Sequence, residues 1–191
     1  MNVLVPVWRK QAWLVPIWWK HWLSAWPDCP YPVIMIVSDK QWATQMMEYL
    51  QPNQPPFLLM LSDYILQDVN RPLMQKAVEA IERPGVGFVR VEPVPAPTLP
   101  WPYDDDFGRI DPNEPYVVSL QPALWKASLL KSVLMPDETP WQIEQRGNKR
   151  LRGYKGHNLL GTKKPALKFL NYLHRGEPEP DAVRWVQEFK Q

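Results

Sequence analysis

A single cysteine, Cys29, occurs in this chain of 191 residues. One thiol excludes an internal disulfide and a metal site made of several thiolates, and it is typical of a reducing compartment. The sequence also has no run of 18 apolar residues and no charged start followed by a cleavage site. It therefore predicts a protein that is not secreted and has no membrane span, and it indicates no obligate protein partner.

Three common kinds of catalytic site are also missing. The eight glycines form no phosphate-binding loop of the P-loop or dinucleotide type. The histidines, His21, His157 and His174, lack the spacing of zinc ligands. Ser119 does not lie in a nucleophile elbow, so the sequence does not support a hydrolase triad.

Acidic residues are absent between positions 145 and 176, although the whole chain has a net charge of only +2. A solvated basic face is one explanation of such a run. Its length favours a phosphate-bearing partner, either a nucleotide diphosphate or the backbone of a nucleic acid. The basic side chains of this acid-free segment are Arg146, Lys149, Arg150, Arg152, Lys155, Lys163, Lys164, Lys168 and Arg175.

Length and composition predict one globular α/β domain. Hydrophobic residues make up 45% of the chain, and its length suits one core better than two. Expected strands alternate with expected helices, which indicates a mainly parallel sheet flanked by helices. The Pro- and Asp-rich stretch 93–114 is predicted to be a functional loop. We expect strands at 3–7, 32–38, 57–61, 86–91 and 116–120, and helices at 11–26, 41–50, 71–83, 122–134, from 141, at 166–174 and at 181–189.

Asp63 is a candidate ligand-binding carboxylate. It follows the apolar run 57–61, so it is expected at the carboxyl edge of the sheet, where open α/β sheets bind ligands. Val7, Asp39 and Arg90 lie at the ends of other expected strands and are predicted to converge on the same edge. A solvated strand-end Asp is the alternative explanation of Asp63.

Glu144 is a second candidate. It follows Trp141 at a point where a loop is expected to turn into a helix. A carboxylate placed in this way can act as a general base that takes a proton from a hydroxyl group. The alternative is a capping role in the first helical turn, where the helix dipole stabilises a negative charge.

Asp104, Asp105 and Asp106 form an acidic triplet. Three consecutive carboxylates in an extended loop point in different directions, so we do not expect them to chelate one ion. Asp106 is kept as a candidate group for binding a ligand hydroxyl, and an ordinary loop role is the alternative.

Five segments occur in an order that resembles a known family. They are Trp26–Pro32, Leu61–Leu66, Gly87–Val91, Val118–Trp125 and Glu138–Glu144. The chain resembles small bacterial and phage glycosyltransferase-like proteins with the GT-A (nucleotide-diphospho-sugar transferase) fold. The resemblance implies a GT-A-like, Rossmann-type domain at residues 1–160 and a basic, helical extension at 161–191 packed on it. It also implies a location in the cytoplasm of a bacterium, or of the host cell if a phage encodes the chain.

The resemblance implies an inverting glycosyltransferase that uses a nucleotide-diphosphate sugar, most simply a UDP-sugar. Enzymes of this fold usually bind Mg²⁺ or Mn²⁺ through an Asp-x-Asp pair. Here the matching residues are Ser62-Asp63-Tyr64, so Asp63 is the one acid of the pair that is present. Glu144 would be the general base. The donor would contact Val7, Asp39, Asp63, Arg90 and Trp141, and Trp125 either walls the sugar as Trp141 does or packs in the core.

The acceptor implied by some phage relatives is a hydroxymethylated base in DNA, which would be flipped out of the duplex. Asp106 would then bind a hydroxyl, and Arg146, Arg150, Arg152 and Lys155 would contact phosphates. Two alternatives stay open: a transferase directed at a polysaccharide, and a non-catalytic nucleic-acid-binding protein that uses the same fold.

Overall fold

The fold is built around one large sheet. A computed structural model describes residues 1–152 and 154–189. Within these ranges, eight strands form a sheet in the order β2-β1-β3-β8-β5-β9-β7-β6. They are β1 (Asn2–Trp8), β2 (Val33–Ser38), β3 (Phe57–Leu59), β5 (Val86–Arg90), β6 (Leu99–Pro100), β7 (Phe107–Arg109), β8 (Ala123–Trp125) and β9 (Asn158–Thr162).

Most strands of this sheet point the same way. β1 is parallel to β2 and to β3, and β5 is parallel to β9. β8 lies antiparallel between β3 and β5, and β7 is antiparallel to β9 and to β6. All of the eight described strands except β7 and β8 therefore share one direction, which confirms the predicted α/β fold with a mainly parallel sheet. Their carboxyl ends form one edge of the sheet.

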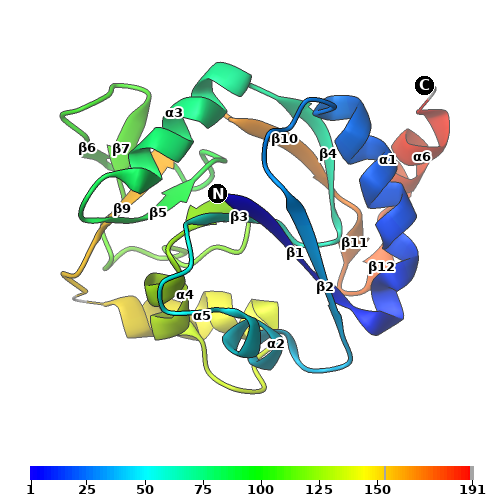
Figure 1. Ribbon diagram of the computed structural model, residues 1–191, viewed down its shortest axis with the longest axis horizontal. Helices are drawn as coiled ribbons and strands as arrows, with labels where there is room; N and C mark the ends of the chain where they lie inside the picture. The colour runs from blue at the N-terminus through cyan, green and yellow to red at the C-terminus, as the bar shows by residue number, and fades with distance from the viewer. Residues whose placement is uncertain (153, 190–191) are drawn as a thin grey trace.

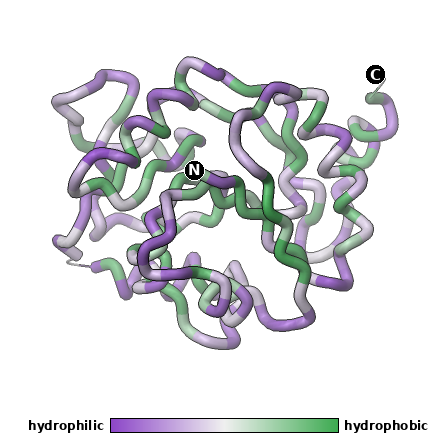
Figure 2. Tube along the Cα trace, viewed as in Figure 1, coloured by the Kyte–Doolittle hydropathy of each residue, from purple (hydrophilic) through white to green (hydrophobic). Residues whose placement is uncertain are grey.

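Helices cover both faces of the sheet (Figure 1). Successive residues of β1 point to opposite faces, so Val3, Val5 and Val7 enter one core while Leu4 enters the other. Figure 2 shows hydrophobic residues concentrated along β1 at the centre of the molecule. The first core includes α1 (Val15–Ala25), α3 (Arg71–Glu82) and α6 (Pro180–Glu188), and the second includes α2 (Trp42–Tyr49), α4 (Ala127–Val133) and α5 (Pro140–Leu151).

Two smaller sheets complete the described fold. β4 (Tyr64–Val69) pairs with β10 (Leu167–Asn171), and β11 (Leu173–His174) pairs with β12 (Glu177–Pro178). The 3₁₀ helix η1 (Arg9–Leu14) leads from β1 into α1. None of the helices in the described ranges is long and apolar enough to cross a lipid bilayer.

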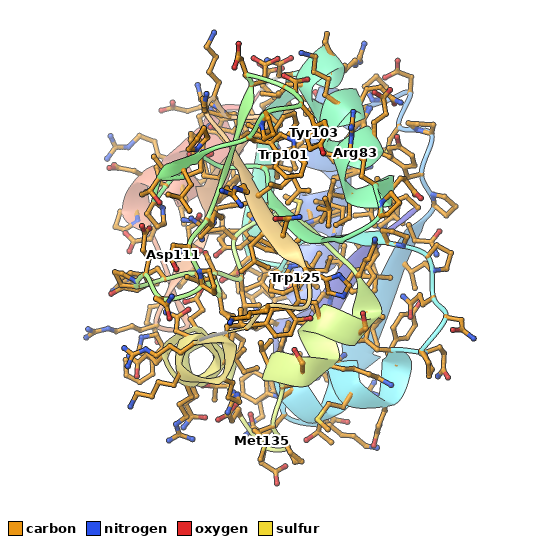
Figure 3. The ribbon with its side chains drawn as sticks, turned by 90° about the vertical axis from the view of Figure 1, so that its left-hand side faces the viewer. Arg83, Trp101, Tyr103, Asp111, Trp125 and Met135 are labelled. Atoms are coloured by element: carbon orange, nitrogen blue, oxygen red, sulfur yellow. The ribbon has the colours of Figure 1, made fainter. Side chains whose placement is uncertain are left out.

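Aromatic contacts fasten the loop after β5 to the end of α3. The rings of Trp101 and Tyr103 lie 4.9 Å apart, and the Arg83 guanidinium lies 5.2 Å from the centre of the Tyr103 ring. Figure 3 shows these three side chains together at one end of the molecule, with Met135 at the opposite end and Trp125 between them. Trp125 is buried against Phe88, at 4.4 Å between ring centres, so packing is its role.

The predicted strand at 116–120 is wrong. Residues 117–120 are buried, but their backbone pairs with side chains and not with a neighbouring strand. The Val118 N–H donates to Asn148 Oδ1 at 2.6 Å and the Leu120 N–H donates to Glu144 Oε1 at 2.7 Å. Because two side chains of α5 satisfy these amides, an apolar run that looks like a strand forms an irregular loop.

Three predicted helices also need correction. The helix at 166–174 is wrong, because Leu167–Asn171 forms β10 and is held in strand geometry by pairing with β4. The helix at 122–134 begins only at Ala127, after β8. The helix at 11–26 is α-helical only from Val15, after η1. In the first two cases pairing with strands distant in sequence decides the outcome over local propensity.

Residues 161–189 join the main body through strand pairing and through α6. β9 spans residue 160, the predicted domain boundary, and β10 pairs with β4 in a two-stranded sheet. α6 lies beside α1, where the ring of the buried His21 is 4.8 Å from Trp185 and 4.3 Å from Phe189. These contacts place residues 161–189 against the same core as the preceding strands.

Candidate functional site

A cleft of about 390 Å³ opens at the carboxyl edge of the sheet. Trp8 at the end of β1, Asp63 beyond the end of β3, and Thr139 and Pro140 at the start of α5 line it. The remaining lining includes Gln11, Lys40, Gln41, Trp42 and Gln45. The cleft therefore lies where open α/β sheets commonly bind ligands.

Asp63 is a largely buried carboxyl group in the wall of this cleft. Burial raises the pKa of Asp63 from 3.8 to about 6, and a hydrogen bond from its own backbone only partly opposes this effect. Within residues 1–152 and 154–189, no Lys or Arg forms a salt bridge with it. Its backbone is fixed, because the Asp63 carbonyl accepts a hydrogen bond from the Tyr172 N–H at 2.7 Å. A carboxylate with a pKa of about 6 is well suited to accept a proton near neutral pH.

Tyr64 connects Asp63 with Glu144. Burial raises the pKa of the Tyr64 phenol above its usual range, and the nearby charges of Asp63 and Glu144 raise it further. The Tyr64 ring packs on Phe169 at 4.8 Å between ring centres. The two predicted catalytic carboxylates thus both lie close enough to Tyr64 to raise its pKa.

Glu144 lies one helical turn beyond Pro140 and is pinned in place. Its Oε1 accepts the Leu120 N–H at 2.7 Å. Burial raises the pKa of Glu144, while this hydrogen bond and the charge of Arg90 act in the opposite direction. The helix cap is formed by Thr139 and Gln142, which exchange side-chain and backbone hydrogen bonds, so capping is not the role of Glu144.

Arg90 was predicted to bind the donor, but its guanidinium is buried and directed at backbone carbonyls. It donates to the carbonyls of Pro95 at 2.7 Å, Tyr116 at 2.7 Å and Val117 at 3.2 Å. Burial lowers the pKa of Arg90 to about 10, and the charge of Glu144 opposes this shift. Tyr116 has a left-handed φ of 58°, which is rare for a bulky residue. Arg90 therefore holds the loop around a strained residue.

The other predicted donor contacts, Val7, Asp39 and Trp141, are not among the residues that line the cleft. Asp39 is exposed and accepts a hydrogen bond from Arg9 Nε at 2.7 Å. Val7 is buried in the first core, while its neighbours Pro6 and Trp8 line the cleft. Trp141 is 66% exposed, directly after Pro140, and is available to a ligand.

The predicted phosphate contacts are spread over other parts of the surface. Arg150 forms a salt bridge with the buried Glu138 at 2.5 Å, and Arg146 approaches the same carboxylate at 3.4 Å. Burial alone would raise the pKa of Glu138, but these two arginines outweigh it and hold the pKa below its usual value. Arg152 is exposed, and Lys155 lines a separate pocket. None of these four residues lines the cleft that contains Asp63.

Asp106, the predicted hydroxyl ligand, forms a salt bridge with Lys76 at 2.5 Å. Lys76 also binds Asp104 at 3.2 Å, which places the acidic triplet against α3. This pairing favours the alternative of a structural loop role.

The protein alone does not supply enough ligand atoms to hold a metal ion in this cleft. In the described residues, no three His, Cys, Asp or Glu side chains are grouped as metal ligands. Asp63 is the one acidic residue among those that line the cleft. Because divalent cations take about six oxygen ligands, one carboxylate would have to be supplemented almost entirely by water and substrate.

Three residues of the cleft lining, Trp8, Lys40 and Gln45, are not predicted from the sequence. Trp8 ends β1 as Asp63 follows β3, so the rule that identified Asp63 also applies to Trp8. Gln45 donates to the Ile36 carbonyl, and Lys40 Nζ binds Glu48 at 2.5 Å. Lys40 lies in the bend before α2 and Gln45 lies within α2, and no local pattern distinguishes either from other polar residues of such segments.

Comparison with known proteins adds evidence on the fold. No family model matches the chain, and no curated protein matches its sequence. Its structure is similar to the crystal structure of residues 1–349 of TarS from S. aureus, with a TM-score of 0.51 and 13% sequence identity. The match covers 97% of this chain and 63% of that one. TarS is a glycosyltransferase with the GT-A fold, so the fold of this chain is GT-A-like.

Proposed function

We propose that the protein is a glycosyltransferase that moves a sugar from a nucleotide-diphosphate donor, such as a UDP-sugar, to an acceptor hydroxyl. The observation that carries the proposal is the largely buried, unpaired carboxyl group of Asp63 in a cleft at the carboxyl edge of a GT-A-like sheet. The cleft volume of about 390 Å³ suits a small organic ligand.

The proposed reaction is a single displacement. The acceptor oxygen forms a bond to the anomeric carbon, the bond from that carbon to the diphosphate breaks, and a carboxylate takes the hydroxyl proton. Asp63 is the better placed base, since it lines the cleft and its pKa is about 6. Glu144, whose Oε1 accepts the Leu120 N–H, is a positioning residue or a second candidate base.

The leaving diphosphate needs positive charge. Lys40 lines the cleft and would exchange its exposed salt bridge with Glu48, at 2.5 Å, for the diphosphate. The amino end of α5 at Thr139 and Pro140 lines the same space, where its helix dipole favours negative charge. Trp8 and Trp141 offer apolar ring faces at the rim, which suit the donor's base or its sugar. No step is assigned to Mg²⁺ or Mn²⁺, because the cleft lining supplies only one carboxylate, Asp63, to hold such an ion.

Hydrolysis of radiolabelled sugar nucleotides tests the proposal with no acceptor added, because water can take the place of the acceptor hydroxyl. We expect the wild type to hydrolyse at least one UDP-sugar slowly, and Asp63→Asn to lower that rate by roughly 10²-fold. Asp39→Asn is the matched control, since it removes a carboxylate that follows β2, two strands away from β3, and that lies outside the cleft lining. Activity that disappears on chelation and returns with Mn²⁺ would assign Asp63 to a metal instead. The proposed function would be refuted if the protein neither bound nor hydrolysed any sugar nucleotide.

The acceptor is proposed to be a polysaccharide, with a hydroxymethylated base in DNA as the second candidate. Arg146 and Arg150 are paired with Glu138, which reduces the positive charge available for a nucleic-acid backbone. Transfer assays with both acceptors at low and high salt separate the two candidates. Transfer to a neutral glycan should change little with salt, whereas transfer to DNA should fall steeply.

A further inference from the structure

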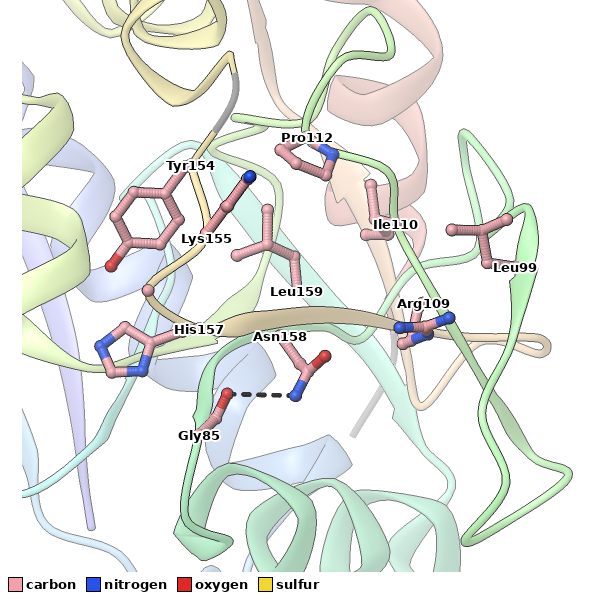
Figure 4. A pocket seen from close by; sticks show the side chains of 11 residues that line it. Gly85, Leu99, Arg109, Ile110, Pro112, Tyr154, Lys155, His157, Asn158 and Leu159 are labelled. Carbon is pink, nitrogen blue, oxygen red and sulfur yellow. Dashed lines mark hydrogen bonds between the residues drawn. The ribbon is translucent and has the colours of Figure 1, made fainter.

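A second pocket, of about 300 Å³, opens far from the cleft that contains Asp63. Gly85 immediately precedes β5 and Asn158 begins β9, so this pocket lies at the amino ends of parallel strands. The cleft lies at the opposite edge of the sheet. Figure 4 shows Tyr154 and His157 on one side of the second pocket, Arg109 on the other, and Leu159 and Ile110 between them.

The charged lining of this amino-edge pocket has one sign. Arg109 and Lys155 line it, together with the titratable His157, and no Asp or Glu is among its lining residues. Asp111 is the neighbouring acid in sequence, but its Oδ1 accepts hydrogen bonds from the backbone and side-chain nitrogens of Asn113, at 2.8 and 2.9 Å. The pocket is therefore electropositive, although the chain as a whole is nearly neutral.

Its hydrogen-bond donors are not used up by the protein. Arg109 donates through Nε to the Pro100 carbonyl at 3.3 Å, which leaves its terminal N–H groups for a ligand. In the described part of the chain, neither Arg109 nor Lys155 forms a salt bridge. His157 Nδ1 is buried without a hydrogen-bond partner there. This contrasts with Arg150, which is neutralised by Glu138.

Apolar side chains separate the cationic groups. Ile110, Pro112 and Leu159 line the pocket between Arg109 on one side and Lys155 on the other, and Leu99 lies on the Arg109 side. A bare inorganic ion would leave these surfaces without a contact. A phosphate group attached to a small organic body would use both the basic and the apolar parts of the lining.

We infer that the amino-edge pocket is a binding site for a small phosphorylated metabolite, distinct from the cleft that contains Asp63. The acid-free segment contributes Lys155 and His157 to it, and β7 contributes Arg109. Part of the acid-free segment would thus bind a phosphate group that belongs neither to the sugar-nucleotide donor nor to a nucleic acid.

Nuclear magnetic resonance of the whole 191-residue chain with labelled histidine tests this inference, because the chain contains only three histidines. The probes are inorganic phosphate, ribose 5-phosphate, uncharged ribose and a short DNA duplex. We expect ribose 5-phosphate to shift the His157 signals saturably at millimolar concentration, and inorganic phosphate to do so more weakly. Ribose should have no effect, and the signals of His21, which is buried against α6, should not move.

Two double variants with the same change in charge provide the control. Arg109→Gln with Lys155→Gln should weaken ribose 5-phosphate binding by at least roughly tenfold, since charged hydrogen-bond donors are lost. Arg152→Gln with Lys163→Gln, which lie outside the pocket lining, should leave the affinity unchanged. Equal weakening by both variants would overturn the inference in favour of a diffuse electrostatic attraction. It would also be overturned by phosphate probes that leave His157 unshifted, or by a duplex that shifts it when ribose 5-phosphate does not.

Discussion

Glu144 Oε1 accepts the N–H of Leu120 at 2.7 Å, across 24 residues of sequence, and so joins α5 to the loop that precedes β8. The neighbouring amide of Val118 is satisfied from the same helix by Asn148 at 2.6 Å. α5 therefore both lines the cleft with its first residues and shapes the loop behind it with its second and third turns.

Substitutions of Glu144 should separate its structural role from a catalytic one. Glu144→Ala leaves the buried Leu120 amide without an acceptor and should lower the free energy of unfolding by about 1–3 kcal/mol. Glu144→Gln keeps an oxygen acceptor and should unfold close to the wild type. Urea unfolding and sugar-nucleotide turnover are measured on both variants. If Glu144→Gln is stable but loses roughly 10²-fold in turnover, Glu144 and not Asp63 is the base.

Arg90 should be required for the loop and not for donor binding. Arg90→Met removes the donors to three backbone carbonyls, and these buried oxygens are left unsatisfied. We expect a loss of more than about 2 kcal/mol in the free energy of unfolding. Arg71→Met is the matched control, because its salt bridge with Asp28 is exposed and should contribute less than about 1 kcal/mol. A stable Arg90→Met variant that fails to bind a sugar nucleotide would restore the predicted donor contact.

Asp63 and Arg90 were both predicted from their positions at strand ends. The prediction located Asp63 in the cleft lining, but it did not reveal that Arg90 binds backbone carbonyls. An apolar run that ends in a carboxylate is enough to locate Asp63 at the carboxyl edge. A strand-end arginine has the same local pattern whether it faces a ligand or the carbonyls of Tyr116 and Val117. Those carbonyls are 26 and 27 residues away, and only the folded loop brings them to the guanidinium.

The same limit explains the loop at 116–120 and the strand β10. Residues 117–120 are buried, whereas in β10 only Leu167 is buried and the other residues are half-buried or exposed. Whether a buried segment becomes a strand depends on its backbone partner, which is α5 for the loop and β4 for β10. Neither partner is encoded in the segment itself.

Ionisation of Asp63 should destabilise the fold. The pKa is raised from 3.8 in the unfolded chain to about 6 in the folded protein, so the protonated form is favoured by folding. The stabilising contribution is complete below pH 3.8 and is lost as the pH rises through about 6. Asp63→Asn, which mimics the protonated form, should therefore be more stable than the wild type near neutral pH, by on the order of 2 kcal/mol. Urea unfolding of both proteins between pH 4 and 8 measures this difference, which should vanish at the acidic end; a constant difference would show that Asp63 does not titrate in this range.

Arg150 and Arg152 are close in sequence but should respond differently to substitution. Arg150→Gln leaves the buried Glu138 with Arg146 alone, at 3.4 Å, and should lower the free energy of unfolding by about 1–3 kcal/mol. Arg152→Gln removes an exposed charge and should leave stability within about 0.5 kcal/mol of the wild type. Retention on duplex DNA is measured for both variants over a range of salt concentrations. Because Arg150 is already paired, its substitution should not change the slope of log affinity against log salt, whereas each lost phosphate contact would reduce that slope by about 0.9. A smaller slope for Arg150→Gln at unchanged stability would mean that DNA displaces Glu138, and the acid-free segment would then be a nucleic-acid-binding surface.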